Sequence, residues 1–484
     1  MAALKITLLL MVVVSVVDAG VSISPSMPRY LPVPAPNSYP AVPALPEPYP
    51  DSNHPPVPAS PVPSPDSYPA VPATQPIPIP IASPPPPSSP VPSPILYPPE
   101  SAGPVPAHIS YPPESASPVP APVSSSPPTL SPMPSPIPPS RGIKGAYWPS
   151  FDGFPASAID TSYFTHLYYA FLLPDPITYE LAITQYDLDK LAEFTGALHA
   201  HNPPVKTLLS IGGGGNDPKV FSKIASGCST RAIFINSTIN VARKYGFDGV
   251  DLDWEFPANQ EDMANLALLF SDWRKALVKE AKATARPRLL LTSAVYFASK
   301  FFFGEPRSYP GDSIRQNVDW VSPMCFDYHG TWDTTTTGEH AALYDPHSNI
   351  STSFGLQSWI DAGVPPKKVV MGLPLYGRTW RLKDPSVNGI GAPAVGVGPG
   401  SGILVYSEVV DFNNENNATV KYDGETVSMY SFSGDSWIGY DDVQSIKVKI
   451  QFARSHGLGG YFFWALGQDK DWTISRQAWN SWEY

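Results

Sequence analysis

The stretch that decides the fold reads Phe247-Asp248-Gly249-Val250-Asp251-Leu252-Asp253-Trp254-Glu255. Side chains alternate between the two faces of a β-strand, so positions 251, 253 and 255 place three carboxylates on one face. The positions between them are Val, Leu and Trp, an apolar set suited to packing against helices. The pattern predicts a buried strand with an acidic row on its inner face. Asp248 has the opposite parity and is expected to be structural.

Short apolar, β-branched runs recur along residues 142–484, with amphipathic segments between several of them. The eight expected strands span 143–148, 166–171, 207–211, 249–253, 289–294, 320–325, 369–373 and 460–464. The clearest expected helices span 187–199, 232–245 and 261–281. Continuous apolar strands that alternate with helices indicate a parallel sheet covered on both faces, and eight such units fit an α/β fold, the (β/α)8 TIM barrel. Residues 381–440 are expected to form a small α+β insertion between strands seven and eight.

Functional residues of such barrels lie at the carboxyl ends of the strands, where the acidic row is expected. Three carboxylates this close cannot all ionise freely, so at least one is expected to hold a proton near neutral pH. A proton-holding carboxyl is the general acid that a glycosidic leaving group needs. A Mg²⁺ or Ca²⁺ site and a solvated acidic loop are the alternatives. We predict no metal, because aromatic residues are expected around the row.

A Gly-rich turn follows the third expected strand in Ser210-Ile211-Gly212-Gly213. Such a turn can cradle phosphate, but no Gly-Lys-Ser/Thr follows it, and Asn216-Asp217-Pro218 breaks both nucleotide-binding patterns. We expect a tight turn at the end of a strand, in which Ser210, Gly212 and Gly213 are structural.

The N-terminal 140 residues differ in composition from the rest of the chain. Residues 1–19 have the pattern of a signal peptide, with Lys5 before an apolar run and a small-residue cleavage site at Val17-Asp18-Ala19. The run is shorter than the roughly 20 residues that a membrane span needs. Residues 20–140 hold 44 of the 63 prolines and repeat short motifs. They are expected to form a polyproline II arm, since Pro prevents helix and sheet from propagating.

The charge balance and the two cysteines exclude several classes of protein. The chain has 31 Lys and Arg against 42 Asp and Glu, so it offers no basic patch for nucleic acid. Two cysteines exclude a disulfide-rich scaffold and a cysteine-ligated zinc site. Cys228 and Cys325 are expected to be separate thiols, with a single disulfide as the alternative. The sequence also carries three N-glycosylation sequons, at Asn236, Asn349 and Asn417.

The acidic stretch resembles the D-x-x-D-x-D-x-E motif of glycoside hydrolase family 18, the chitinase family. Further motifs of the family follow in order. Ser210-Ile211-Gly212-Gly213 matches S-x-G-G on strand three, and Met324-Cys325-Phe326-Asp327 stands where strand six carries M-x-Y-D. Tyr376-Gly377-Arg378 matches strand seven, and Trp464 ends strand eight. The resemblance covers residues 142–484 and is closest to the plant class V branch, whose insertion domain the 381–440 segment resembles.

The resemblance implies a retaining, substrate-assisted chitinase without a cofactor. Glu255 would protonate the glycosidic oxygen, and Asp253 would orient the substrate's acetamido group, whose oxygen attacks the anomeric carbon. Asp251 would share a proton with Asp253, and Trp464 would form the floor of the cleavage subsite. The remaining expected substrate-binding residues are Met324, Asp327, Tyr328, Tyr376, Arg378, Phe171, Trp148, Trp332 and Trp380. For Trp148, Trp332 and Trp380, a place in the core is the alternative.

One residue departs from the family pattern. The strand-six Tyr of the family donates a hydrogen bond to the acetamido oxygen, and this chain has Phe326 there. Loss of one such donor typically costs about 3 kcal/mol, or roughly 100-fold in rate. Tyr328 and Tyr376 are the candidates to replace it. Impaired activity or retuned specificity is therefore expected.

Two other functions remain open at this point. The chain could be a chitin-binding, lectin-like protein with weak activity, or a structural protein of the cell wall whose Pro-rich arm, similar to hydroxyproline-rich glycoproteins, carries the function. The expected partners are chitin or chitooligosaccharides, with attachment to the wall through residues 20–140. No nucleic acid or membrane span is expected, and the expected location is extracellular.

Overall fold

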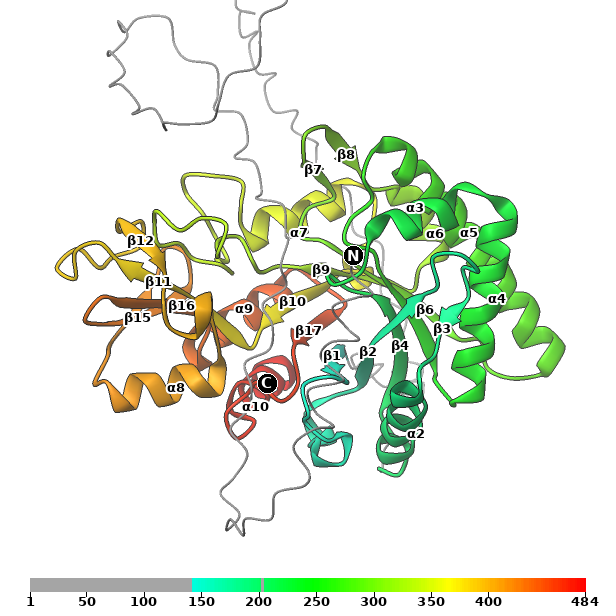
Figure 1. The fold of residues 1–484 in the computed structure, drawn as a ribbon, viewed down its shortest axis with the longest axis horizontal. Helices are drawn as coiled ribbons and strands as arrows, with labels where there is room; N and C mark the ends of the chain where they lie inside the picture. The colour runs from blue at the N-terminus through cyan, green and yellow to red at the C-terminus, as the bar shows by residue number, and fades with distance from the viewer. Residues whose placement is uncertain (1–141, 202–203) are drawn as a thin grey trace, which may run out of the picture. The chain divides into compact units, whose positions relative to one another are not determined.

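The computed structural model describes residues 142–201 and 204–484 (Figure 1). The predicted signal peptide and the predicted Pro-rich arm lie outside the described residues. The predicted barrel lies within them, and its strands and helices follow one another along the chain as the sequence pattern indicates.

Eight parallel strands form the barrel, and each coincides with one predicted strand to within a few residues. Their hydrogen-bonded order is β10-β17-β1-β2-β4-β5-β6-β9. A parallel bridge between Val321 and Val369, at the two outer strands, brings the ends of this order together. The strands are β1 (Ile143–Pro149), β2 (His166–Pro174), β4 (Lys206–Gly212), β5 (Gly249–Asp253), β6 (Leu290–Tyr296), β9 (Trp320–Met324), β10 (Val370–Pro374) and β17 (Gly460–Trp464).

Helices connect the strands around the outside of the barrel (Figure 1). Thr184 begins α2 with a capping box to Asp187, and Asn259 caps α5, so local polar residues set where these helices start. None of the helices in 142–201 and 204–484 has the length and apolarity to cross a membrane. The helices are α2 (Gln185–His199), α3 (Pro218–Ser226), α4 (Cys228–Lys244), α5 (Gln260–Thr284), α6 (Gly311–Asn317), α7 (Thr352–Asp361), α9 (Val443–Ser455) and α10 (Thr473–Glu483).

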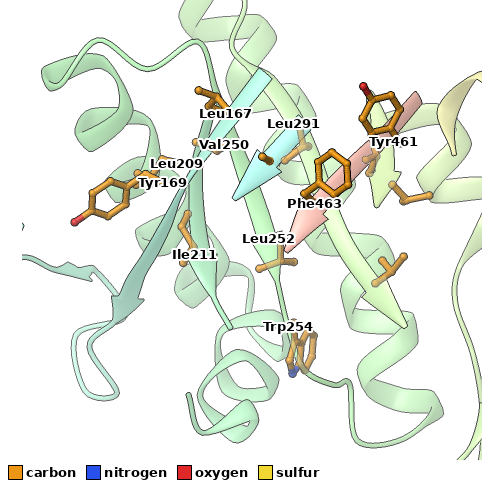
Figure 2. Packing of buried hydrophobic residues seen from close by; sticks show 14 of the residues in the cluster. Leu167, Tyr169, Leu209, Ile211, Val250, Leu252, Trp254, Leu291, Tyr461 and Phe463 are labelled. Carbon is orange, nitrogen blue, oxygen red and sulfur yellow. The ribbon is translucent and has the colours of Figure 1, made fainter. Parts of the chain in front are cut away.

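The apolar positions of β5 face the surrounding helices, as the alternation predicts. Val250 and Leu252 are fully buried and Trp254 is 3% exposed. They belong to the large core cluster that also holds Leu209 and Ile211 of the neighbouring strand (Figure 2). This packing fixes the rotation of β5, so the acidic positions must face the inside of the barrel.

The insertion after β10 is an antiparallel sheet in the order β12-β11-β16-β15-β14, with β13 on β11. It begins at Tyr376, five residues before the predicted start, because β11 follows β10 almost directly. The sequence pattern did not reveal its helix, α8 (Tyr406–Glu415). The strands are β11 (Tyr376–Leu382), β12 (Ala394–Val397), β13 (Ile403–Val405), β14 (Thr419–Asp423), β15 (Ser428–Ser433) and β16 (Ser436–Tyr440).

Three short strands and four 3-10 turns complete the described chain. β7 and β8 form a hairpin between β6 and α6, and β3 pairs with β2. Their bounds are β3 (Leu181–Ala182), β7 (Lys300–Phe302), β8 (Pro306–Ser308), η1 (Ala156–Ala158), η2 (Thr161–Tyr163), η3 (Pro366–Lys368) and η4 (Pro399–Gly402).

Candidate active site

The acidic row lies at the carboxyl end of β5, inside the barrel. Asp251 is level with Ser210 of β4 and Thr292 of β6, and Asp253 is level with Gly212 and Ala294. Glu255 follows two residues beyond the end of the strand. The three carboxylates therefore rise from the barrel interior to its mouth in the order that the alternation predicts.

Asp251 is fully buried and accepts three hydrogen bonds. The hydroxyls of Tyr147 and Ser210 donate to its Oδ2 at 2.9 and 2.7 Å, and the hydroxyl of Thr292 donates to its Oδ1 at 2.5 Å. Burial raises the pKa of Asp251, and the three donors oppose that rise. These contacts fix the carboxylate in one orientation behind Asp253.

Asp253 is 4% exposed, and its Oδ1 has no hydrogen-bond donor among the described residues. Burial first, and then the charges of Glu255 and Asp251, raise the pKa of Asp253 well above its ordinary value. Burial and the two neighbouring charges therefore favour the protonated form of Asp253. The direction of this shift is the one expected for a member of the row that holds a proton.

Glu255 is half-buried at the mouth of the barrel, and its charge acts on both Asp253 and Tyr309. It is the member of the row that a substrate lying across the mouth reaches first. A carboxyl at this position is suited to proton transfer to a bound group.

Aromatic rings surround the row. Trp464, at the end of β17, stacks on Phe171 with ring centroids 5.6 Å apart and planes at 19°. The ring centroids of Tyr147 and Trp464 are 5.7 Å apart. Because the Tyr147 hydroxyl also donates to Asp251, this aromatic surface extends from Trp464 to Asp251. Trp464 and Phe171 are only partly buried and can offer ring faces to a sugar.

A second polar group stands where β9 and the insertion meet. Tyr376 donates to Asp327 Oδ1 at 2.8 Å, and the Arg378 Nε donates to the same oxygen at 2.8 Å. Burial would raise the pKa of Asp327, but Arg378 and then His340 outweigh it and lower the pKa to about 2. Arg378 also lies over the ring of half-buried Trp332, 5.0 Å from its centroid. These four predicted site residues, Asp327, Tyr376, Arg378 and Trp332, therefore lie together.

Met324 and Phe326 line the interior next to the aromatic surface. Both are partly buried and pack against the cluster that includes Tyr147, Tyr168 and Phe462. The Phe326 ring meets Tyr376 and Phe462 edge-on, at 6.3 and 6.2 Å. Phe326 therefore faces the site, as the matching Tyr of the family motif would, but brings no hydroxyl.

The prediction that Tyr328 contacts substrate is wrong. Its side chain is 5% exposed, packs against Phe297, and its hydroxyl lies 3.0 Å from Thr352 Oγ1 at the start of α7. Asp327 has a positive φ of 60°, which ends the strand alternation and turns Tyr328 away from the barrel. Tyr328 therefore cannot supply the donor that Phe326 lacks, and the Tyr376 hydroxyl is already held by Asp327.

Two predicted groove tryptophans belong to the core instead. Trp148 is fully buried, stacks on Phe194 of α2, and donates its indole N–H to the Phe154 carbonyl. Trp380 is 1% exposed, packs edge-on against Trp437 in the insertion, and donates to the Asp333 carbonyl. The alternative of a core position is correct for both residues.

The residues predicted to be structural hold the row in place. Gly212 and Gly213 have φ values of 119° and 84°, and a Cβ on Gly212 would lie 2.0 Å from the Asp253 carbonyl oxygen. Asp248 lies at the other end of β5, where it binds Lys206 Nζ at 2.6 Å and the Thr207 amide at 3.0 Å. Ser210 is more than a scaffold residue, because it donates to Asp251.

Sequence reasoning missed Tyr147, Thr292 and His340. Tyr147 precedes Trp148, and the alternation of β1 already places it on the inner face. Thr292 follows from the pairing of β5 with β6, which alternation alone does not give. His340 is 1% exposed, and its Nδ1 lies 3.8 Å from Asp327; the loop that brings it there has no sequence signal.

The described part of the chain offers no group of three or more His, Cys, Asp or Glu side chains that could hold a metal ion. Both cysteines are free thiols, Cys228 exposed at the start of α4 and Cys325 buried.

Comparisons with known proteins identify the family of this chain. Residues 144–469 match the family described as glycosyl hydrolases family 18. A class V chitinase, CHIT5a, from Medicago truncatula is 57% identical over 347 residues, which is 71% of this chain and 90% of that protein. A crystal structure of a class V chitinase from Nicotiana tobaccum covers 71% of this chain and 99% of its own, with 38% identity and a TM-score of 0.69. A family 18 chitinase from Cycas revoluta, solved in complex with (GlcNAc)3, covers 70% and 99%, with 43% identity and a TM-score of 0.67. The chain therefore belongs to glycosyl hydrolase family 18.

Proposed function

We propose that this protein is a chitinase that hydrolyses β-1,4 linkages between N-acetylglucosamine units by a retaining, substrate-assisted mechanism. The observation that carries the proposal is the intact acidic row, with a half-buried Glu255 at the barrel mouth above a buried Asp253 whose pKa is raised. Similarity to class V chitinases, and to a family 18 chitinase with bound (GlcNAc)3, supports the substrate class.

Glu255 donates its proton to the glycosidic oxygen, and the bond from that oxygen to the anomeric carbon breaks. The carbonyl oxygen of the substrate's own 2-acetamido group bonds to the same carbon and gives an oxazolinium ion. Water, deprotonated by the Glu255 carboxylate, then attacks this carbon and restores the acetamido group. Two inversions at one carbon leave the product with the configuration of the substrate.

Asp253 orients the acetamido group for this attack. Its Oδ1, buried and without a donor among the described residues, is a ready acceptor for the acetamido N–H. Its proton is shared with Asp251, where three hydroxyl donors stabilise negative charge. The pair therefore places an acceptor and a negative charge beside the oxazolinium ion.

Trp464 and the Asp327 group bind the sugar. The exposed face of Trp464, backed by Phe171, suits the apolar face of a pyranose ring. Asp327 stays ionised because its pKa is about 2, so it accepts hydrogen bonds from sugar hydroxyls at any physiological pH. Phe326 leaves the acetamido oxygen with one donor fewer, which lowers the rate but removes no reacting group.

Product release from chitohexaose by the purified full chain tests the proposal. The Glu255→Gln variant keeps the shape of the side chain but has no proton to give, so we expect release by the wild type and not by this variant. The Glu261→Gln variant, changed at an exposed position of α5, is the matched control and should retain full activity. Binding of chitohexaose by both wild type and Glu255→Gln without release from either would contradict the enzyme and identify a lectin.

We also propose that the chain is exported and that residues 20–140 place the barrel in the cell wall. The basis is the leader-like pattern of residues 1–19 and the proline content of the segment that follows. Fractionation of the producing tissue into wall, soluble apoplast and cell contents tests this. Protein found only in the cell contents would contradict it.

A further inference from the structure

A groove on the outside of the barrel plays no part in the chemistry described above. It lies between α7 and α9 and has a volume of about 440 Å³. Aromatic rings form its apolar surface: Tyr344 and Phe354 are each 42% exposed, and Phe452 lies edge-on to Tyr344 at 6.0 Å. Polar residues, among them Asp345 and Gln357, also line it. Exposed rings beside polar groups are the surface that binds a sugar.

The groove contains the asparagine of a glycosylation sequon. Asn349 lines it, is exposed, and begins the sequence Asn349-Ile350-Ser351. Its side-chain amide makes no hydrogen bond to any described residue. Asp345 shapes the loop before it by accepting from the amides of His347 and Ser348 at 2.8 and 3.2 Å. The loop therefore presents Asn349 to solvent while its own polar groups are satisfied.

The other two sequons lack this setting. Asn236 lies within α4, and Thr238 of its sequon is fully buried and bonded to the Ile235 carbonyl. Asn417 is exposed at a turn with a φ of 46°, outside the residues that line the groove. Among the three, only the sequon at 349 opens onto an aromatic groove.

We propose that Asn349 carries an N-linked glycan whose first N-acetylglucosamine packs against Tyr344 and Phe354. In the modification the Asn349 nitrogen bonds to the anomeric carbon of a lipid-linked oligosaccharide, the bond from that carbon to the lipid diphosphate breaks, and the amide proton leaves. The co-reactant is the lipid-linked oligosaccharide of the secretory pathway. The proposal thus rests on export and is independent of hydrolysis.

The full chain from Gly20, secreted from a plant cell host behind a host leader, separates this proposal from the fate of the native leader. Mass spectrometry of the peptide that contains Asn349 should show an attached glycan. An endoglycosidase that cuts between the first two sugars should act on this glycan several-fold more slowly in the native protein than after denaturation. Asn417→Gln should leave that ratio unchanged.

Tyr344→Ser and Phe354→Ser, made singly at exposed positions, should each bring the native rate of cutting close to the denatured rate. A thermal melt of each variant confirms that it is folded. One folded variant is enough to test whether the glycan packs on these rings. Unmodified Asn349 in the secreted protein would overturn the proposal. A glycan at Asn349 that is cut equally fast in native and denatured wild-type protein would overturn it as well.

Discussion

The raised pKa of Asp253 lowers the stability of the folded protein at neutral pH. A carboxyl whose folded pKa is raised keeps its proton in the native state after the unfolded chain has lost it. Unfolding of the wild type therefore becomes progressively easier as pH rises above about 4, the ordinary Asp pKa, toward the raised folded pKa. The same burial that destabilises the fold keeps Asp253 available to the acetamido group.

Asp253→Asn should remove this pH dependence, because Asn does not titrate. We expect its melting temperature to exceed that of the wild type at about pH 8 and the difference to shrink toward about pH 4, where Asp is protonated in both states. Differential scanning fluorimetry across this range measures it, with exposed Asp189→Asn as the control. A difference that is constant with pH would contradict the raised pKa.

Phe326→Tyr should raise kcat/KM on chitohexaose, because the ring faces the site and gains a donor for the acetamido oxygen. One such donor is worth up to about 100-fold in rate. Steady-state kinetics of wild type and variant measure the effect. An unchanged or lower kcat in a variant with the wild-type melting temperature would mean that another group already supplies this hydrogen bond.

Substitutions of Trp148 and Trp464 should differ in effect, because Trp148 packs in the core and Trp464 is proposed to bind substrate. Trp148→Phe should lower stability by about 1–3 kcal/mol through lost packing and leave KM unchanged. Trp464→Phe should raise KM with little change in stability, since its ring is partly exposed. Thermal melts and kinetics of the two variants together decide between these roles. A raised KM in Trp148→Phe, with the stability of the wild type, would show that Trp148 contacts the substrate.

Among the elements, sequence alternation gave reliable results inside the barrel strands and failed just beyond them. It placed Asp251, Asp253 and Glu255 correctly because a continuous strand has only two faces. Tyr328 was misplaced because the left-handed backbone of Asp327 ends the alternation one residue earlier. For Trp380 both a groove and a core position were open, because the faces of an insertion strand cannot be assigned before its packing partners are known.

Some contacts come from tertiary structure and leave no trace in the local sequence. Thr292 reaches Asp251 through the register of two adjacent strands, and His340 reaches Asp327 from a loop. Tyr147 is the exception, because the alternation of β1 alone places its side chain on the inner face.

At the scale of the whole molecule, the family match spans residues 144–469 and leaves the Pro-rich residues outside it. All the site residues lie within the barrel and its insertion. Deletion of residues 20–140 should therefore leave kcat and KM on soluble chitohexaose unchanged to within about twofold, while reducing binding to isolated cell walls. Kinetics and wall sedimentation of the two chains measure this. A large loss of kcat would show that the arm takes part in catalysis.

In the proposed mechanism the substrate's acetamido group, held by Asp253, is the nucleophile. Proton NMR during the first turnovers of chitohexaose hydrolysis tests this most directly, because it reports the anomer formed before mutarotation. The β-anomer should appear first, since the mechanism retains configuration. Initial formation of the α-anomer would contradict it, as would the absence of any product.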